Sequence, residues 1–504
     1  MKNASIHRAK LNISTTLLSQ IVATACGIVI PRVMIATYGS ATYGITTSIA
    51  QFLTYITLLE SGIGRVARAE LYKPLAERNE YEISRVYYAI KHFFRIVGFA
   101  FIGYTLVLSL TYYDIAHVES VSRTTVFLLV WVISTSTLAK YLSGLANLTL
   151  LNADQRQYLG NTIISVTTVL NALLIVILTQ FDSDVVLVKL GSSLIYIAQP
   201  VCYAIFVRKL FKLRPVGKNR SKLAQKWTGI GQHLAYFIHT NTDIVMLTVL
   251  ADVCLVAVYS VYSLVISSIR KIAISFTGGM EAAFGALIAR GEKKELQDAF
   301  RQYKFLLSFV TVLLFGTTAV MIVPFVRLYT RGITDANYIR PTFAVLLLFA
   351  EALDCFSFPC SSLPVSANKL KETRWGSYGE AAINIVLSLV LIWWNPLIGV
   401  AIGTLAATVF KTVYYMIYSG KHILQIKLRE LAKYTLFTVG IIALFAGLGL
   451  LLAERVAIDN YFVWALWGAA SFVAVAFVSV ASSLILYPKE LRKTFELLKR
   501  KTRR

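Results

Sequence analysis

The sequence predicts an all-α integral membrane protein of about 14 transmembrane helices. We expect two six-helix lobes related by pseudo-two-fold symmetry, followed by two C-terminal helices. Hydrophobic residues fill 57% of the 504 positions and charged residues 15%, and the mean hydropathy is +0.65. A soluble core cannot bury so much apolar surface. The apolar residues also gather in runs of about 20, the length of a helix that crosses a bilayer. The third observation is that Lys and Arg concentrate in alternate loops.

Fourteen apolar runs are long enough to span the membrane, and short polar or basic segments separate them. In order, they are 12–36, 43–64, 86–111, 124–149, 158–180, 184–207, 230–251, 253–278, 304–328, 341–366, 375–395, 397–419, 432–453 and 461–487. These runs divide the chain into an N-lobe at 1–209, a basic cytoplasmic linker at 210–229, a C-lobe at 230–420, and spans 13 and 14 with a basic tail at 421–504.

The distribution of basic residues predicts the orientation in the membrane. Loops on one side contain 39 Lys and Arg residues, and those on the other contain six. Basic loops stay in the cytoplasm, so both termini are predicted to be cytoplasmic, as in a protein of a bacterial inner membrane. The net charge of +24 therefore indicates topology and not a nucleic-acid partner.

A weak internal repeat supports the two lobes. A shift of 213 residues aligns the linker after span 2 with the linker after span 8, and it places Lys91 opposite Lys304. Parallel repeats of an even number of spans are related by an axis along the membrane normal. We therefore expect a cleft between the lobes that supports alternating access.

Four cations lie inside predicted spans on the cytoplasmic half of the membrane: Lys140, Arg270, Lys271 and Lys411. Each is roughly 20–25 Å from the periplasmic end of its span. They would line a positive vestibule that attracts a phosphate-bearing headgroup, or their side chains would snorkel to the inner interface. Arg32, after Pro31 near the outer end of span 1, is either a further anion contact or an interfacial arginine.

Three acids lie close to mid-depth, namely Asp243 in span 7 and Glu351 and Asp354 in span 10. Ionisable groups at this depth are costly and usually functional. Glu351 and Asp354 are one helical turn apart and do not both ionise easily, so they are expected to carry a shared proton or cation or to form ion pairs with cleft cations. We expect coupling to H⁺ or Na⁺ at Asp243, Glu351 or Asp354. Glu380 lies near the inner end of span 11, where we expect it to reach water, and it has no predicted role.

The segment YGSATYGITTSIAQFLTYITLLESGIGR after span 1 resembles the polysaccharide flippases of the multidrug/oligosaccharidyl-lipid/polysaccharide exporter superfamily. The likeness rests on Tyr38-Gly39, Tyr43-Gly44 and the small residues 61–64, and on the arrangement of the spans. It implies flipping of undecaprenyl-pyrophosphate-linked oligosaccharides for O-antigen, capsule or exopolysaccharide synthesis. It also implies that arginines on spans 1, 2 and 8 receive the pyrophosphate, which by position are Arg32, Arg65 and Arg270.

Three other functions are also compatible with the sequence. Drug/cation antiporters of the same superfamily are one, although they are usually two spans shorter. A membrane enzyme acting on lipid-linked sugars is another, but the connections are too short for a catalytic domain. A scaffold without transport is the third. The sequence contains no P-loop, GxSxG or HExxH motif, and we expect no metal, no cofactor and no enzymatic activity. Expected partners are membrane lipids, the lipid-linked oligosaccharide and polysaccharide polymerase machinery.

Overall fold

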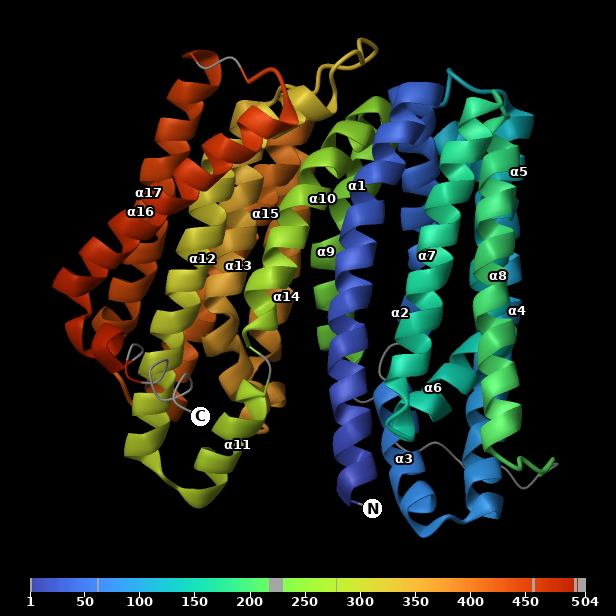
Figure 1. The fold of residues 1–504 in the computed structure, drawn as a ribbon, viewed down its shortest axis with the longest axis horizontal. Coiled ribbons are helices and arrows are strands. Elements are labelled where there is room, and N and C mark those ends of the chain that lie inside the picture. The colour runs from blue at the N-terminus through green and yellow to red at the C-terminus, as the bar shows by residue number, and fades with distance from the viewer. Residues whose placement is uncertain are drawn as a thin grey trace. The chain divides into compact units, whose positions relative to one another are not determined.

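The computed structural model describes residues 2–60, 63–216, 230–277, 279–455, 458–493 and 496. Helices dominate these residues, and no strand occurs among them (Figure 1). The first group of helices is α1 (Lys2–Thr54), α2 (Thr57–Glu60), α3 (Ile63–Glu77), α4 (Glu80–Ile115), α5 (Arg123–Ala139), a π-helix (Lys140–Gly144), α6 (Leu145–Ala153), α7 (Gln157–Gln180) and α8 (Val185–Leu210). The second is α9 (Ile230–Leu250), α10 (Val253–Ser275), α11 (Met280–Arg290), α12 (Lys293–Tyr329), α13 (Pro341–Ser366), α14 (Leu370–Leu391), α15 (Pro396–Ser419), a π-helix (Gly420–Leu424), α16 (Leu428–Arg455) and α17 (Tyr461–Leu486).

The fourteen predicted spans all fall on helical segments of the described residues, with the first two both beginning in α1, and this confirms the all-α membrane fold. Among the described residues, eleven helices are long and apolar enough to cross a bilayer. The number is smaller than fourteen because α1 contains the first two spans, α9 contributes a shorter apolar stretch, and α14 begins with polar turns. The chain is a multi-pass membrane protein.

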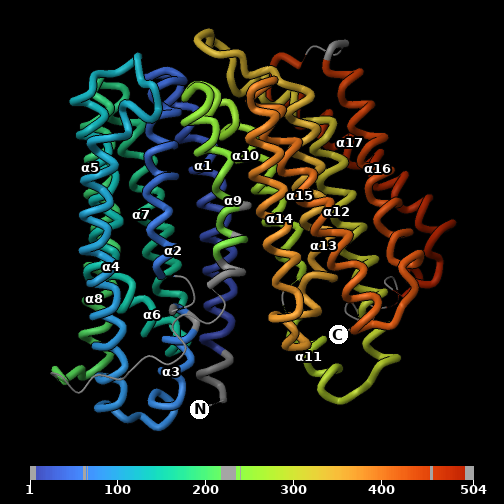
Figure 2. The backbone as a smooth tube through the Cα atoms, turned by 180° about the vertical axis from the view of Figure 1, so that it is seen from behind, coloured from blue at the N-terminus to red at the C-terminus, as the bar shows by residue number. Residues whose placement is uncertain are grey.

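The chain reverses inside α1, and the YGxxxYG motif explains how. Gly39 has φ 81° and ψ 166°, a backbone conformation that side chains disfavour. Figures 1 and 2 show α1 running away from the N-terminus and the chain then returning toward α2 and α3. Gly44 is required for packing, because a Cβ atom there would lie 1.9 Å from the carbonyl oxygen of Val253. Both glycines of the motif therefore serve the fold.

Contacts divide the chain into two compact units. The N-terminal unit comprises Met1–Phe237 and Leu247–Ala257, and the C-terminal unit comprises Ile238–Met246 and Val258–Arg504. In the C-terminal unit, α16 and α17 pack along α12, and both views show them beside it (Figure 2).

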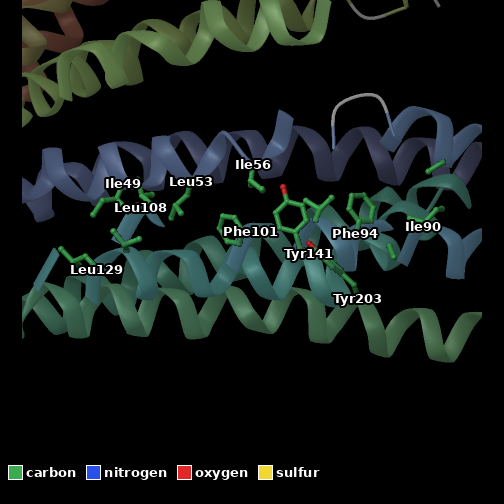
Figure 3. Packing of buried hydrophobic residues seen from close by; sticks show 14 of the residues in the cluster. Ile49, Leu53, Ile56, Ile90, Phe94, Phe101, Leu108, Leu129, Tyr141 and Tyr203 are labelled. Carbon is green, nitrogen blue, oxygen red and sulfur yellow. The ribbon is translucent and has the colours of Figure 1, made fainter. Parts of the chain in front are cut away.

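The core of the N-terminal unit is apolar. Figure 3 shows Ile49, Leu53 and Ile56 meeting side chains of α4, α5 and the π-helix, among them Phe101 and Tyr141. Among its described residues, the buried polar side chains are uncharged, such as those of Asn147, Thr167, Asn171 and Gln199.

Candidate functional site

Five charged side chains of the C-terminal unit form one chain of alternating sign. Their order is Glu351, Arg270, Asp354, Lys411 and Glu380, and they come from α13, α10, α13, α15 and α14. We call this set the charge network. Four of its members, Arg270, Lys411, Glu351 and Asp354, were predicted to take part in substrate binding or ion coupling. The structure brings them together with Glu380.

Asp354 is the centre of the charge network. Its Oδ2 accepts hydrogen bonds from Nε and Nη2 of Arg270, at 2.9 and 2.5 Å. Its Oδ1 accepts one from Nζ of Lys411, at 2.9 Å. The outer acids complete the chain, since Glu351 Oε2 lies 3.1 Å from Arg270 Nε and Glu380 Oε1 lies 3.1 Å from Lys411 Nζ. Each cation therefore bridges two carboxylates.

The charge network is graded in exposure and carries an excess of acid. The side chains of Glu351 and Arg270 are 29% and 24% exposed, whereas those of Asp354, Lys411 and Glu380 are 14%, 12% and 6% exposed. Three carboxylates face two cations, so the set has a formal charge of −1 when all five groups are ionised. A proton or a monovalent cation at the accessible end would neutralise it.

Close contact between α14 and α15 positions Lys411 and Glu380. A Cβ atom on Gly403 would lie 2.1 Å from Ser388 Oγ, and one on Gly399 would lie 2.6 Å from the backbone of Leu391. Small residues let membrane helices approach until polar side chains meet. The Gly399-x₃-Gly403 pair thus brings the two helices together along the length that carries the lysine and the glutamate.

Two prolines shape α13, which carries Glu351 and Asp354. Pro364 cannot donate to the carbonyl of Cys360, and Ser419 Oγ donates to that oxygen instead, at 2.7 Å. Lys304 Nζ donates to the carbonyl of Phe356 at 2.8 Å. Side chains of neighbouring helices therefore bind backbone carbonyls of α13 near its two prolines.

Asp243 lies in a separate group of hydrogen bonds in the same unit. Its Oδ2 accepts from Tyr259 OH at 3.0 Å and from Thr404 Oγ1 at 2.9 Å. Thr404 in turn accepts a hydrogen bond from Asn384 Nδ2 at 3.0 Å. Asp243 is 5% exposed, so the predicted mid-depth acid is buried among hydroxyl and amide groups of α10, α14 and α15.

The other predicted cations are not part of the charge network. Lys271 follows Arg270 on α10 but is exposed. Lys140 begins the π-helix of the N-terminal unit, with Nζ 5.7 Å from the ring centre of Tyr196. Arg32 is partly buried on α1, beside Pro31. The side chain of Arg65 lies outside the described residues. So do residues 217–229, which make up most of the basic linker predicted at 210–229.

Two charged residues of this unit were missed or misplaced by sequence reasoning. Glu380 was predicted to reach water at a helix end but is buried beside Lys411. Lys304, counted among loop charges, is 1% exposed and lies 3.3 Å from the ring centre of Phe356. Glu380 lies about one turn inside the predicted span 375–395, and Lys304 is the first residue of the predicted span 304–328, so a charge at the border of an apolar run was the available signal.

Comparisons with known proteins agree on the fold. No protein-family model and no curated protein matches the chain. The structure of the lipid II flippase MurJ in an inward closed conformation aligns with 94% of this chain and 98% of its own, at 13% identity and a TM-score of 0.68. An inward-facing MATE multidrug transporter of the MOP superfamily aligns with 84% of this chain and 99% of its own, at 14% identity and a TM-score of 0.57.

A variant of the Vibrio cholerae MATE transporter VcmN also aligns with this chain. The alignment covers 84% of this chain and 99% of the transporter, at 16% identity and a TM-score of 0.53. The chain has the fold of MurJ and the MATE transporters. The superfamily resemblance found in the sequence is thus confirmed at the level of the fold.

Proposed function

We propose that this protein flips an undecaprenyl-pyrophosphate-linked oligosaccharide from the cytoplasmic to the periplasmic leaflet by alternating access. The observation that carries the proposal is the extent of the likeness to the lipid II flippase, which covers 94% of this chain against 83% to 88% for MATE transporters that align at TM-scores of 0.52 to 0.57. Drug/cation antiporters of the superfamily are usually two spans shorter, so their smaller coverage fits a chain that carries two additional C-terminal helices. The setting is a bacterial inner membrane, with both termini in the cytoplasm.

Cations supply the proposed binding site for the pyrophosphate. Arg270 is the leading candidate because it is one of the two most accessible members of the charge network and its guanidinium forms bidentate contacts with phosphate. The remaining proposed contacts are Arg32, Arg65, Lys140 and Lys411, whereas the exposed Lys271 is assigned to the inner interface of the membrane. The prenyl tail stays in the bilayer, so the polar headgroup alone requires a hydrated path.

Exchange of a proton or Na⁺ at the carboxylates supplies the proposed coupling. Glu351 is the most exposed acid of the charge network and contacts Arg270 alone among the other four members. Neutralising Glu351 leaves Arg270 with Asp354 as its carboxylate partner, and guanidinium donors become available to an anionic substrate. Ion uptake and headgroup binding thereby favour each other. Asp243 is the second proposed ion-coupling carboxylate of this unit.

The excess of acid favours a second candidate function, an ion-coupled antiporter of cationic drugs. Three carboxylates against two cations attract a positively charged ligand. Under this alternative the protein exports cationic compounds, and lipid-linked sugars are unaffected by its loss.

Leaflet-resolved measurement of undecaprenyl-linked oligosaccharide separates the two functions. Cells that lack the protein should accumulate the lipid-linked sugar in the inner leaflet, and re-expression should reverse the accumulation. Unchanged lipid-linked sugars together with lost efflux of a cationic dye would overturn flipping in favour of antiport.

A further inference from the structure

One end of the N-terminal unit contains a cavity of about 860 Å³ with a strongly basic wall. Figure 1 shows the N-terminus, α3 and the end of α8 at this same end of the unit. The turns between α3 and α4 and between α6 and α7 complete the wall. Its cations are Arg8, Arg78, Arg156, Arg208, Lys209 and Lys212, and its acids are Glu80 and Asp154.

Two of the six cations hold the wall together. Arg156 Nε lies 2.5 Å from Asp154 Oδ2, and Arg8 Nη1 donates to the carbonyl of the same aspartate at 3.1 Å. Asn12 adds a hydrogen bond to the carbonyl of Gln155 at 3.0 Å. These contacts fix the N-terminal end of α1 against the turn before α7, so the cavity is a built feature of the unit.

The other four cations are available to a ligand. Among the described residues, Arg78, Arg208, Lys209 and Lys212 form no ion pair with a carboxylate, and all four are exposed. Six cations against two acids leave the wall with a surplus of positive charge. The surplus positive charge therefore favours an anion.

The same cavity has an apolar side. Tyr72, Leu75, Ile83, Leu210, Phe211 and Leu213 line it together with the cations. A small inorganic anion would contact only the cations. An amphiphile would place its charged headgroup on the cations and its hydrocarbon chain on the apolar residues. The basic loops predict that this end faces the cytoplasmic leaflet, which carries anionic lipids.

We propose that this cavity binds the phosphate-bearing headgroup of an anionic membrane lipid of the cytoplasmic leaflet. The site shares no residue with the charge network, and it does not depend on which substrate the protein transports. The lipid anchors the N-terminal unit to the leaflet through Arg78, Arg208, Lys209 and Lys212.

Binding of a fluorescent phosphatidylglycerol to the full chain in neutral detergent, measured by anisotropy, tests this proposal. We expect Arg78→Gln, Arg208→Gln and Lys212→Gln together to weaken binding about tenfold or more, since each basic contact near a lipid headgroup contributes a few-fold in affinity. The matched control combines Lys293→Gln, Lys294→Gln and Lys371→Gln, three exposed lysines of the C-terminal unit. It removes the same charge and should change binding less than about twofold.

Three outcomes would overturn the proposal. Equal weakening in the two triple variants would show general attraction to a basic protein. Equal binding of a fluorescent phosphatidylcholine would show that the headgroup charge is irrelevant. Displacement of the lipid by inorganic pyrophosphate at equal concentration would assign the cavity to a soluble phosphate compound. If the triple variant unfolds, Lys212→Gln alone, at an exposed position after α8, should still weaken binding about threefold.

Discussion

The two units are built from similar numbers of membrane helices but bury different chemistry. Among the described residues of the N-terminal unit, the buried polar side chains are neutral. The C-terminal unit buries Asp243, Lys304 and Glu380, and it also holds Asp354 and Lys411 at 14% and 12% exposure. Buried charges lower stability unless they are paired, so a protein retains them where they have a function. The comparison indicates that buried, paired charges are concentrated in the C-terminal unit, whereas Arg32 and Lys140, two charged side chains within the spans of the N-terminal unit, are partly buried.

The largest effect is expected when the centre of the charge network is removed. Asp354→Asn removes the carboxylate that accepts three hydrogen bonds from Arg270 and Lys411 and leaves each cation with one acid, so we expect a loss of about 3–5 kcal/mol of stability. In the N-terminal unit, Asn171→Leu removes a buried neutral amide and should cost about 1–3 kcal/mol. Thermal unfolding in detergent measures both. Equal decreases in Tm for Asp354→Asn and Asn171→Leu would contradict the claim that the buried charges make the larger contribution to stability.

A smaller effect is expected from separating α14 and α15. Gly403→Ala places a Cβ atom 2.1 Å from Ser388 Oγ, and such overpacking costs about 1–3 kcal/mol. Gly103→Ala on α4 is the matched control, because nothing lies within 4 Å of the added Cβ there. This control should be neutral or slightly stabilising in the same unfolding assay. A tolerated Gly403→Ala would contradict the role given to this contact in positioning Lys411.

Arg270 and Lys271 are adjacent on α10, and comparing their substitutions distinguishes a charge that binds substrate from one that only orients the helix in the membrane. Arg270→Gln should lower flipping about tenfold, equivalent to about 1.4 kcal/mol, because a partner of two carboxylates and of the proposed pyrophosphate is lost. Lys271→Gln removes an exposed charge and should leave flipping within about twofold of the unaltered protein. Flipping is measured at matched abundance in proteoliposomes. Equal loss in the two variants would indicate a general requirement for positive charge.

The smallest effect on stability is expected at Lys140. Its contact with the Tyr196 ring is worth about 0.5–1 kcal/mol at most, so Lys140→Gln should barely change Tm while it lowers affinity for an anionic headgroup. Ligand-induced stabilisation by undecaprenyl pyrophosphate measures that affinity. Normal stabilisation in the variant would exclude Lys140 from headgroup binding and restrict the site to the other cations.

Hydropathy and loop charge were sufficient to predict the fold, because the bilayer imposes one length and one polarity on every span. The spacing of Glu351 and Asp354 was also visible, since one helical turn separates them along α13. The pairing of Asp354 with Arg270 and Lys411 was not, because the partners are 84 and 57 residues away and meet through tertiary packing.

Glu380 shows the main limit of depth estimates from sequence. Its position near the predicted end of a span indicated access to water, but the close packing of α15 against α14 buries it. Gly44 belongs to the motif that carried the family resemblance. The structure gives it a packing role as well, because its missing side chain allows the close contact with Val253. Depth along a helix is predictable from the chain, and the face that a side chain occupies depends on neighbouring helices.

The most direct test of the account is translocation of undecaprenyl-pyrophosphate-linked oligosaccharide in proteoliposomes, with and without proton and Na⁺ gradients, for the unaltered protein and for Glu351→Gln. The account predicts that an ion gradient accelerates flipping by the unaltered protein about fivefold or more, and that Glu351→Gln keeps the basal rate but loses this acceleration. Absence of flipping by the unaltered protein would contradict the proposed function. Full acceleration in Glu351→Gln would contradict the assignment of coupling to the accessible end of the charge network.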